Sequence, residues 1–480
     1  MSPDYRKMAD DDAAHANGAG PADDGDTTPA DWTDAQAAAA FALHIAGRYL
    51  YVATWRRWLR WDGRRWATDG TESVYEEARR WVIDQLHAAL DAHVAESVQR
   101  TARSFRARSK VEAIVTMARR MQAIAIDAQV LDADHGALNC LNGVVNLRTG
   151  AITPHDPSQR HTKLAGARYV PGAVHGDVAT ALAALDVEPL RFVQTFIGYS
   201  ATGHTSEDAV VIFDGPGGNG KTTVLVACTA ALGDYASPVD PRLIMQQRHE
   251  DHPTIKADLR GRRLVFISET PEGGYLNAER LKSLSGGEPI KARFIGADYF
   301  QFDPTHKIIV ATNHRPRVGG NDDAIWRRLH LVPFTRLYRS PERMGGGTVP
   351  VDKGLRDRVQ RGAGQREATL AWVVEGAIRW HADGLMAPPA IVESTDEWRD
   401  QEDAIVRFSA DRLAFDPALA LPGKALYIAY TDWCRGEGMF PKSNKNFARE
   451  SIAHASVRDR VSVVKASTTL YKGIGLTSAF

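Results

Sequence analysis

The sequence predicts an α/β fold with a parallel central sheet, preceded by a mostly helical α+β domain and followed by a small C-terminal domain. Two observations lead to this prediction. A glycine-rich turn in "VVIFDGPGGNGKTTVLVA" joins a short apolar run, typical of a buried strand, to a helical pattern. Between residues 205 and 338, further apolar runs alternate with helical patterns, which is the order expected of a parallel sheet.

The glycine-rich turn has the spacing of a loop that binds nucleotide phosphates. Gly215 is followed after four residues by Gly220, Lys221 and Thr222. Backbone N–H groups then face the phosphates, the lysine places a charge beside the β- and γ-phosphates, and the threonine hydroxyl is a ligand for Mg²⁺. We therefore expect bound ATP and Mg²⁺, with nucleotide contacts from Gly215, Pro216, Gly217, Gly218, Asn219, Gly220, Lys221, Thr222 and Thr223.

Two later strands are expected to deliver polar side chains to the same site. The apolar run at 264–267 ends at Ser268 and Glu269, and "HKIIVATN" ends at Asn313. Nucleotide hydrolysis requires an acidic residue that holds Mg²⁺ or polarises the attacking water, and Glu269 is the candidate for either role or both. An ordinary surface carboxylate is the alternative interpretation. Asn313 is a candidate for orienting the same water.

Two adjacent arginines, Arg327 and Arg328, precede another apolar run. In a ring of subunits, an arginine at this place could reach the γ-phosphate bound by the neighbouring subunit. The alternative is a structural salt bridge, which we expect for at least one of the two.

A basic hairpin is expected between the second and third of these strands. "IKARFI" and "YFQF" flank a Gly-Ala-Asp turn, and Lys291 and Arg293 alternate onto one face with an aromatic residue nearby. Lys282 lies near the end of the preceding helix. Alone, the hairpin would be interpreted as a solvated face, but within a nucleotide-driven domain these three residues are candidates for contacting a nucleic-acid backbone.

Composition restricts the class of protein. Lys plus Arg and Asp plus Glu both number 59, so the net charge gives no indication of a polyanionic partner. The three cysteines are isolated, which argues against a disulfide framework and against a zinc site made of cysteine alone. No stretch approaches 18 consecutive apolar residues, so we expect a soluble, cytoplasmic protein without a membrane partner.

Six regions are expected along the chain. Residues 1–36, rich in Ala, Gly, Asp and Pro, are expected to form a disordered acidic tail. The other regions are an N-terminal domain at 37–175 that begins with a Trp/Arg-rich hairpin, a helical linker at 176–204, the nucleotide-binding domain at 205–338, a helical segment at 339–399, and a C-terminal domain at 400–480.

Four segments together resemble the phage/plasmid primase-helicase family, which is related to the poxvirus primase-helicases and whose motor is a superfamily 3 AAA+ ATPase. In chain order they are "GALNCLNGVVNLRTGAITPHDP", "FIGYSATGHTSEDAVVIFDGPGGNGKTT", "SETPEGGYLNAERLKSLSGGEPIKARFI" and "FDPTHKIIVATNHRPRVGGNDDAIWRRLHLVPF". Glu288 stands where the family usually has Asp, which keeps the carboxylate.

The resemblance implies an ATP-dependent DNA helicase that forms a ring, most simply a hexamer, and translocates on single-stranded DNA at a fork. It implies that Asn313 is the sensor residue and that Arg328 is the preferred arginine finger, with Arg327 second. It implies a winged helix at 400–480, where Lys442, Lys445 and Arg449 are candidates for phosphate contacts, although a solvated basic face is an equally simple interpretation. A separate primase or polymerase is a further expected partner.

Three alternatives to a helicase are considered. A loader or remodeller would keep the ATPase without unwinding DNA, and a sequence-specific initiator would require an origin-binding domain. A primase would require paired carboxylates for two metal ions, for which "LDADH", with Asp132 and Asp134, is the only candidate. Because this segment lies in a loop without room for a polymerase domain before it, we interpret it as a polar turn.

Overall fold

The computed structural model describes residues 33–477 except 93–94, 248–253, 295, 297, 319–322, 341, 343–347, 438–440, 454–459 and 466–468. The chain divides after Leu131 into two compact units, and each is considered by itself. Most of the predicted acidic tail lies outside the described residues. Its last three residues are helical, because α1 (Asp34–Ile45) begins with a capping box in which Thr33 and Gln36 bond each other's backbone N–H groups.

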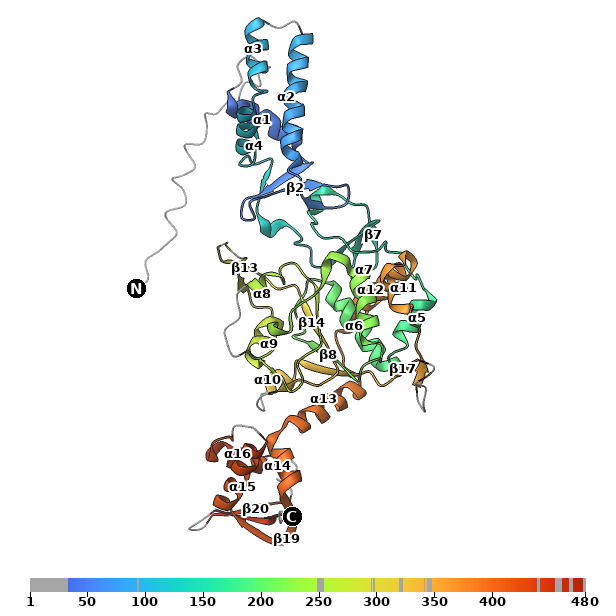
Figure 1. The fold of residues 1–480 in the computed structure, drawn as a ribbon, viewed down its shortest axis with the longest axis vertical. Helices are drawn as coiled ribbons and strands as arrows, with labels where there is room; N and C mark the ends of the chain where they lie inside the picture. Colours follow the sequence, from blue (N-terminus) through green and yellow to red (C-terminus); the bar gives the residue numbers. More distant parts are fainter. Residues whose placement is uncertain are drawn as a thin grey trace, which may run out of the picture. The chain divides into compact units, whose positions relative to one another are not determined.

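The first unit combines a small sheet with four helices (Figure 1). The Trp/Arg-rich stretch forms the predicted antiparallel strands, β1 (Tyr49–Val52), β2 (Arg57–Trp61) and β3 (Trp66–Thr68), and β4 (Ala125–Ile126) pairs with β1 in parallel. The amphipathic region contains α2 (Ser73–Asp91), α3 (Glu96–Ser104) and α4 (Arg108–Ala118). Phe41, Trp81 and Ile114 are buried in the core that α1, α2 and α4 share.

The segment from Asp132 to Ala201 packs with the nucleotide-binding domain, which corrects two predicted boundaries. The predicted hairpin strands β5 (Ala137–Cys140), β6 (Gly143–Asn146) and β7 (Ile152–Thr153) form an antiparallel sheet. Arg263, which precedes a central strand, donates to the Ala137 carbonyl at 2.7 Å. The N-terminal unit therefore ends near residue 131 and not near residue 175.

The predicted linker is a core element. It contains α5 (Gly176–Leu182) and α6 (Val187–Ala201), and most of the α6 side chains are buried. α6 packs along α12 (Ala363–Asp383), where Gln194 Nε2 donates to the Trp372 carbonyl at 2.9 Å. A linker interpretation fails because α6 is apolar on the face that covers the sheet.

The central sheet has five parallel strands, as predicted for residues 205–338. Their order is β16 (Leu329–Pro333), β8 (Val210–Asp214), β14 (Lys307–Thr312), β10 (Leu264–Ser268) and β9 (Ala236–Pro238). Side chains alternate between two cores: Val211 and Phe213 face α6, α7 (Lys221–Leu232) and α12, whereas Val210 and Ile212 share the other core with α9 (Ala278–Ser285). Cover on both faces explains why these strands are continuously apolar.

Strand order places a ligand site at the ends of β8 and β14. These neighbours leave the sheet in opposite directions, because the next sheet strand after β8 is β9, beyond β14 and β10, and the next after β14 is β16, beyond β8. Such a reversal opens a crevice beyond the carboxyl ends of the two strands.

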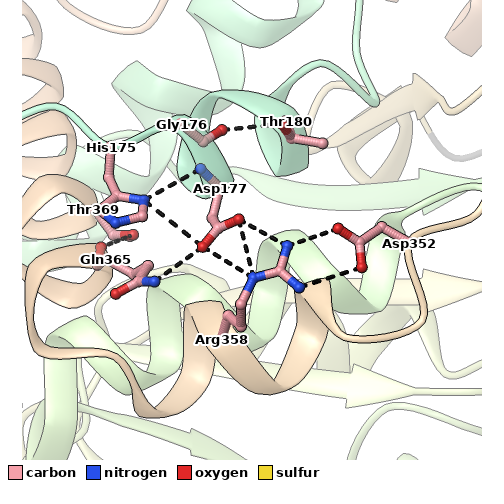
Figure 2. Close-up of polar contacts among 8 residues, drawn as sticks. All are labelled: His175, Gly176, Asp177, Thr180, Asp352, Arg358, Gln365 and Thr369. Carbon is pink, nitrogen blue, oxygen red and sulfur yellow. Dashed lines mark hydrogen bonds and ion pairs between the residues drawn. The ribbon is translucent and has the colours of Figure 1, made fainter.

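A polar cluster fixes the helices that flank α7 (Figure 2). Arg358 in α11 (Leu355–Arg361) donates to Asp177 in α5 at 2.7 Å and to Asp352 at 2.6 Å, and Gln365 in α12 donates to Asp177 at 2.9 Å. Beside this cluster, buried Ala181, Ala227 and Val359 pack α5, α7 and α11 together. The cluster therefore holds in place the helix that begins at Lys221.

The C-terminal region is a compact set of helices and a small sheet. α13 (Pro389–Glu402) covers β16, and beyond it lie α14 (Ala404–Arg412), α15 (Gly423–Gly436) and α16 (Asn444–Ala453). The antiparallel sheet has the order β19 (Leu413–Pro422), β21 (Thr469–Leu476), β20 (Ser462–Lys465). Phe408, Tyr430 and Phe447 form its aromatic core. The winged-helix interpretation of this region remains a prediction.

Two chemical properties of the whole chain complete the description. All three cysteines are buried and free, and burial raises the pKa of Cys140 and of Cys228 to about 12. None of the helices in the described ranges is long and apolar enough to span a membrane.

Candidate nucleotide-binding site and basic hairpin

The glycine-rich loop connects the end of β8 to the start of α7, as predicted. Gly215 and Gly220 have φ values of 146° and 90°, which disfavour residues with a side chain. A Cβ at Gly215 would lie 2.5 Å from the Phe334 carbonyl, and one at Gly220 would lie 2.7 Å from Ala184 Cβ. Both glycines are required by the turn, whereas Gly217 faces open space and has no positive φ.

Lys221 and Asn313, predicted from separate strands, meet at this loop. Lys221 Nζ donates to Asn313 Oδ1 at 3.1 Å and to Asn219 Oδ1 at 3.0 Å, and it also bonds the Gly215 carbonyl. The lysine is buried, which lowers the pKa of its ammonium group, and the nearby Asp214 carboxylate opposes this shift. The cation is therefore held by oxygen acceptors at the place where the loop turns into α7.

The remaining loop residues brace the turn or face solvent. Asn219 is buried and donates to the Phe334 carbonyl at 3.1 Å, so this side chain fixes the loop to the segment after β16. Pro216 lines the adjoining cavity. Thr222 is exposed at the second position of α7 and Thr223 is half-buried. An exposed threonine hydroxyl beside a lysine fits a Mg²⁺ ion that takes its other ligands from phosphate and water.

Glu269 follows β10, one strand further from the loop than Asn313. The residue is exposed and has a left-handed φ of 67°, and its N–H donates to the Ala311 carbonyl at 2.9 Å. The next residue, Thr270, shares a 2.7 Å hydroxyl contact with Thr312 at the end of β14. The structure thus places Glu269 at the predicted sheet edge, although it is absent from the lining of the cavity beside the loop.

That cavity brings in residues that the sequence analysis missed. It has a volume of about 740 Å³ and is lined by Gly215 and Asn313 together with Asp214, Glu272, Arg315, Arg317 and Glu402. Arg315 Nε donates to Asp214 Oδ2 at 2.8 Å across the ends of β14 and β8. Glu402 accepts from the Val318 N–H at 3.0 Å, and burial raises the pKa of this carboxyl. The same strand-end signal that identified Asn313 would have identified Asp214 and Arg315.

The two candidate finger arginines lie at the opposite edge of the sheet. Leu329 pairs with Val210 and Pro333 with Asp214, so Arg328 lies five residues, or about 16 Å of strand, from the loop edge. Arg328 donates to Asp208 at 2.8 Å and to the Ala324 carbonyl at 2.8 Å. Arg327 is exposed, and its side chain makes no polar contact within the described part of the chain. The expected structural ion pair is therefore made by Arg328.

The basic hairpin forms as predicted. β12 (Ile290–Ala292) pairs antiparallel with β13 (Phe300–Phe302). Lys291 Nζ lies 4.9 Å and the Arg293 guanidinium 5.1 Å from the ring centre of Tyr299, so both cations contact the same aromatic ring. Tyr299 and Phe294 are exposed to 51% and 44%. Lys282 belongs to α9 and is half-buried, so it lies on a different element from the other two.

Comparisons with known proteins agree with this description. The family described as "D5 N terminal like" matches residues 38–198, and a family of unknown function (DUF5906) matches residues 213–328. The chain is 24% identical over 234 residues, 46% of its length, to "Putative helicase L207/L206" of Acanthamoeba polyphaga mimivirus. It is 21% identical over 332 residues, 65% of its length, to "Primase D5" of Fowlpox virus (strain NVSL).

Both relatives are longer proteins: the matched part of the chain spans 24% of the length of the first and 40% of the length of the second. A solved structure, "The apo structure of NrS-1 C terminal region", covers 92% of this chain and all of its own at 12% identity, with a TM-score of 0.49. The match of residues 38–198 to the D5 N-terminal family and the similarity to viral putative helicases and a D5 primase support one assignment: the chain is a D5-like primase-helicase family protein.

Proposed function

We propose that the chain is an ATP-dependent DNA helicase motor of the superfamily 3 type, acting in the replication of a phage or plasmid. The observation that carries the proposal is the contact between Lys221 and Asn313 behind the glycine-rich loop. In this proposal, Lys221 exchanges the loop carbonyls for phosphate oxygens, and Asn313 is released to hold the attacking water. Glu269 or Asp214 supplies the acidic group, and Thr222 would hold a Mg²⁺ ion, which would neutralise charge on the phosphates.

The basic hairpin supports DNA as the second ligand. Its cations and exposed aromatic rings combine charge for phosphates with surfaces on which bases can stack. A primase activity has no support at Asp132 and Asp134. Asp132 Oδ1 accepts from the Thr162 N–H at 2.7 Å, and Asp134 Oδ1 accepts from the Gly136 N–H at 2.9 Å. The Asp132 carboxylate therefore anchors the segment at Thr162, 30 residues later, and the Asp134 carboxylate closes a local turn.

The decisive experiment compares the native chain with Lys221→Ala in ATP hydrolysis and in strand displacement on forks with either tail polarity. Loss of the lysine removes the charge that stabilises the transferred phosphoryl group, so we expect hydrolysis to fall by about 10²–10³-fold and unwinding to cease. Hydrolysis without displacement on either fork would favour the loader alternative. Native turnover in Lys221→Ala would exclude this loop as the site.

A further inference from the structure

A second cavity in the unit that begins at Asp132 contains an unusual group of side chains. Its volume is about 400 Å³, and it shares no lining residue with the nucleotide cavity. Three histidines line it, His135, His204 and His381, together with Asn146 and Arg148. They come from the loop before β5, the end of β6, the segment after α6 and the end of α12, so the cavity is formed by tertiary packing.

The three imidazole rings lie side by side without forming a metal site. The ring centres of His135 and His204 are 5.9 Å apart and those of His204 and His381 are 6.1 Å apart, each pair edge to face. No group of His, Cys, Asp or Glu side chains among the described residues is arranged to hold a metal ion. Burial lowers the pKa of all three, and His381 Nε2 is buried without a hydrogen-bond partner.

Positive charge exceeds negative charge around the cavity. Arg263 and Lys307 are buried nearby and donate to backbone carbonyls, Arg263 to Ala201 at 2.8 Å and Lys307 to His204 at 3.0 Å. Neither forms an ion pair with a carboxylate of the described chain, and Arg148 is exposed at the rim, also without one. Asp134 is the acid on the lining, and its Oδ1 accepts the Gly136 N–H. Buried cations without acidic partners are costly, and a bound anion would offset this cost.

We propose that this cavity binds a phosphate group. A phosphate presents several acceptor oxygens, which match the guanidinium fork of Arg148, the amide N–H groups of Asn146 and one imidazole N–H from each histidine. Asn146 Oδ1 already accepts the Arg148 N–H at 2.9 Å, which turns the amide so that its NH₂ group remains for a ligand.

The phosphate can come from a nucleic-acid backbone or from a free nucleotide, and the cavity's position favours the backbone. Thr205 follows His204, and its Oγ1 lies 3.0 Å from the Cβ position of Gly287, three residues before β12. One residue therefore connects the cavity to the base of the basic hairpin. The inference that the phosphate belongs to a nucleic-acid backbone rests on the proposed function. Phosphate binding itself does not, since it does not depend on ATP hydrolysis.

The first test measures the histidine pKa values by NMR of the chain with labelled histidine, in inorganic phosphate and in chloride at equal ionic strength. An anion stabilises imidazolium, so phosphate should raise the pKa of these histidines, and phosphate affinity should rise as pH falls through their titration. The groups that face them are Arg148, Asp134, Arg263 and Lys307. Arg148→Gln and His381→Gln should each weaken the effect. Arg356→Gln is the matched control, because Arg356 is exposed on α11, which does not line the cavity.

The second test measures the affinity for a 20-nucleotide oligo(dT) without nucleotide over a range of salt. If the ligand is backbone phosphate, Arg148→Gln should weaken binding and reduce the slope of log K against log salt by about 0.7, whereas Arg356→Gln should match the native chain. Unchanged DNA binding with a phosphate-dependent histidine shift would assign the cavity to free phosphate. The proposal is overturned if phosphate does not shift the histidine pKa values and Arg148→Gln does not weaken DNA binding. Neither test measures ATP turnover. The proposal for this cavity can therefore hold even if the glycine-rich loop proves not to hydrolyse ATP.

Discussion

At the scale of single residues, Asn313 offers the sharpest separation of catalysis from binding. Its amide contacts Lys221, but Asn313 directly follows β14 and is not part of the loop, so Asn313→Ala should leave the loop formed. We expect ATP affinity to change little while turnover falls by about 10²-fold, because a group that orients water acts mainly in the transition state. Steady-state hydrolysis and binding of a fluorescent ATP analogue measure the two quantities. Asn446→Ala is the control, because Asn446 is exposed on α16. Equal losses in affinity and turnover would assign Asn313 to nucleotide binding alone.

Spacing alone predicted which residues lie together in the glycine-rich turn, and their role in nucleotide chemistry stays a prediction. Gly215, Gly220 and Lys221 stand at fixed separations in one turn. Lys221 meets Asn313 because the turn follows β8 and Asn313 follows β14, its parallel neighbour in the sheet. Asp214 and Arg315 were missed although both stand at or just after a strand end; what the sequence could not show is the ion pair between them, which joins residues 101 positions apart. The same reason hid the three histidines of the second cavity.

At the scale of elements, the cluster of Figure 2 predicts how stability depends on pH. Hydrogen bonds from Arg358 and Gln365 lower the pKa of Asp177 to about 2, below its ordinary value of about 3.9 in an unfolded chain. The stabilisation is therefore complete above pH 4 and is lost as pH falls toward 2. Arg358→Ala should lower the free energy of unfolding at pH 7, and the difference should shrink in acid. Urea unfolding between pH 3 and 7 measures this, with Arg361→Ala as the control, since its pair with Asp357 is exposed. A constant difference would contradict the assignment.

The hairpin gives the second prediction for an element. Lys291→Ala with Arg293→Ala should leave ATP hydrolysis without DNA unchanged but reduce its stimulation by DNA and the unwinding rate. The pairing of β12 with β13 is made by the backbone, which these substitutions leave in place, so the fold should persist. Loss of two phosphate contacts should lower the salt slope for single-stranded DNA by about 1.4. An unchanged slope would show that the hairpin does not hold DNA.

Element prediction was reliable for strands buried on both faces and unreliable for boundaries between units. The runs at 210–213, 264–267 and 308–311 are apolar throughout because helices cover both sides of the sheet, and this leaves a clear pattern. The helix α6 has an equally strong pattern, but nothing in it distinguishes a linker from a core helix. Its place depends on α12, about 180 residues later in the chain.

At the scale of the whole molecule, the contacts of Arg327 and Arg328 change which of them we expect to act as the arginine finger. Arg328 is held by Asp208, whereas Arg327 is exposed at the edge opposite the loop, so a neighbouring subunit can reach Arg327 without breaking an ion pair. In a head-to-tail ring, Arg327→Ala should lower turnover by about 10³-fold and Arg328→Ala should mainly lower stability. Mixing inactive Arg327→Ala with inactive Lys221→Ala subunits should restore part of the ATPase activity, because some interfaces then combine a native pocket with a native arginine. No recovery in mixtures that assemble by sedimentation would contradict a finger in trans.

The three buried cysteines give the folded chain a practical property. A maleimide reacts with thiolate, and burial both hides these thiols and raises the pKa of Cys140, Cys228 and Cys434. The native protein should therefore stay unlabelled, and Phe294→Cys on the exposed hairpin should provide a single reactive position without removing any other residue. A dye placed there would report, in real time, the DNA binding that we propose for the hairpin.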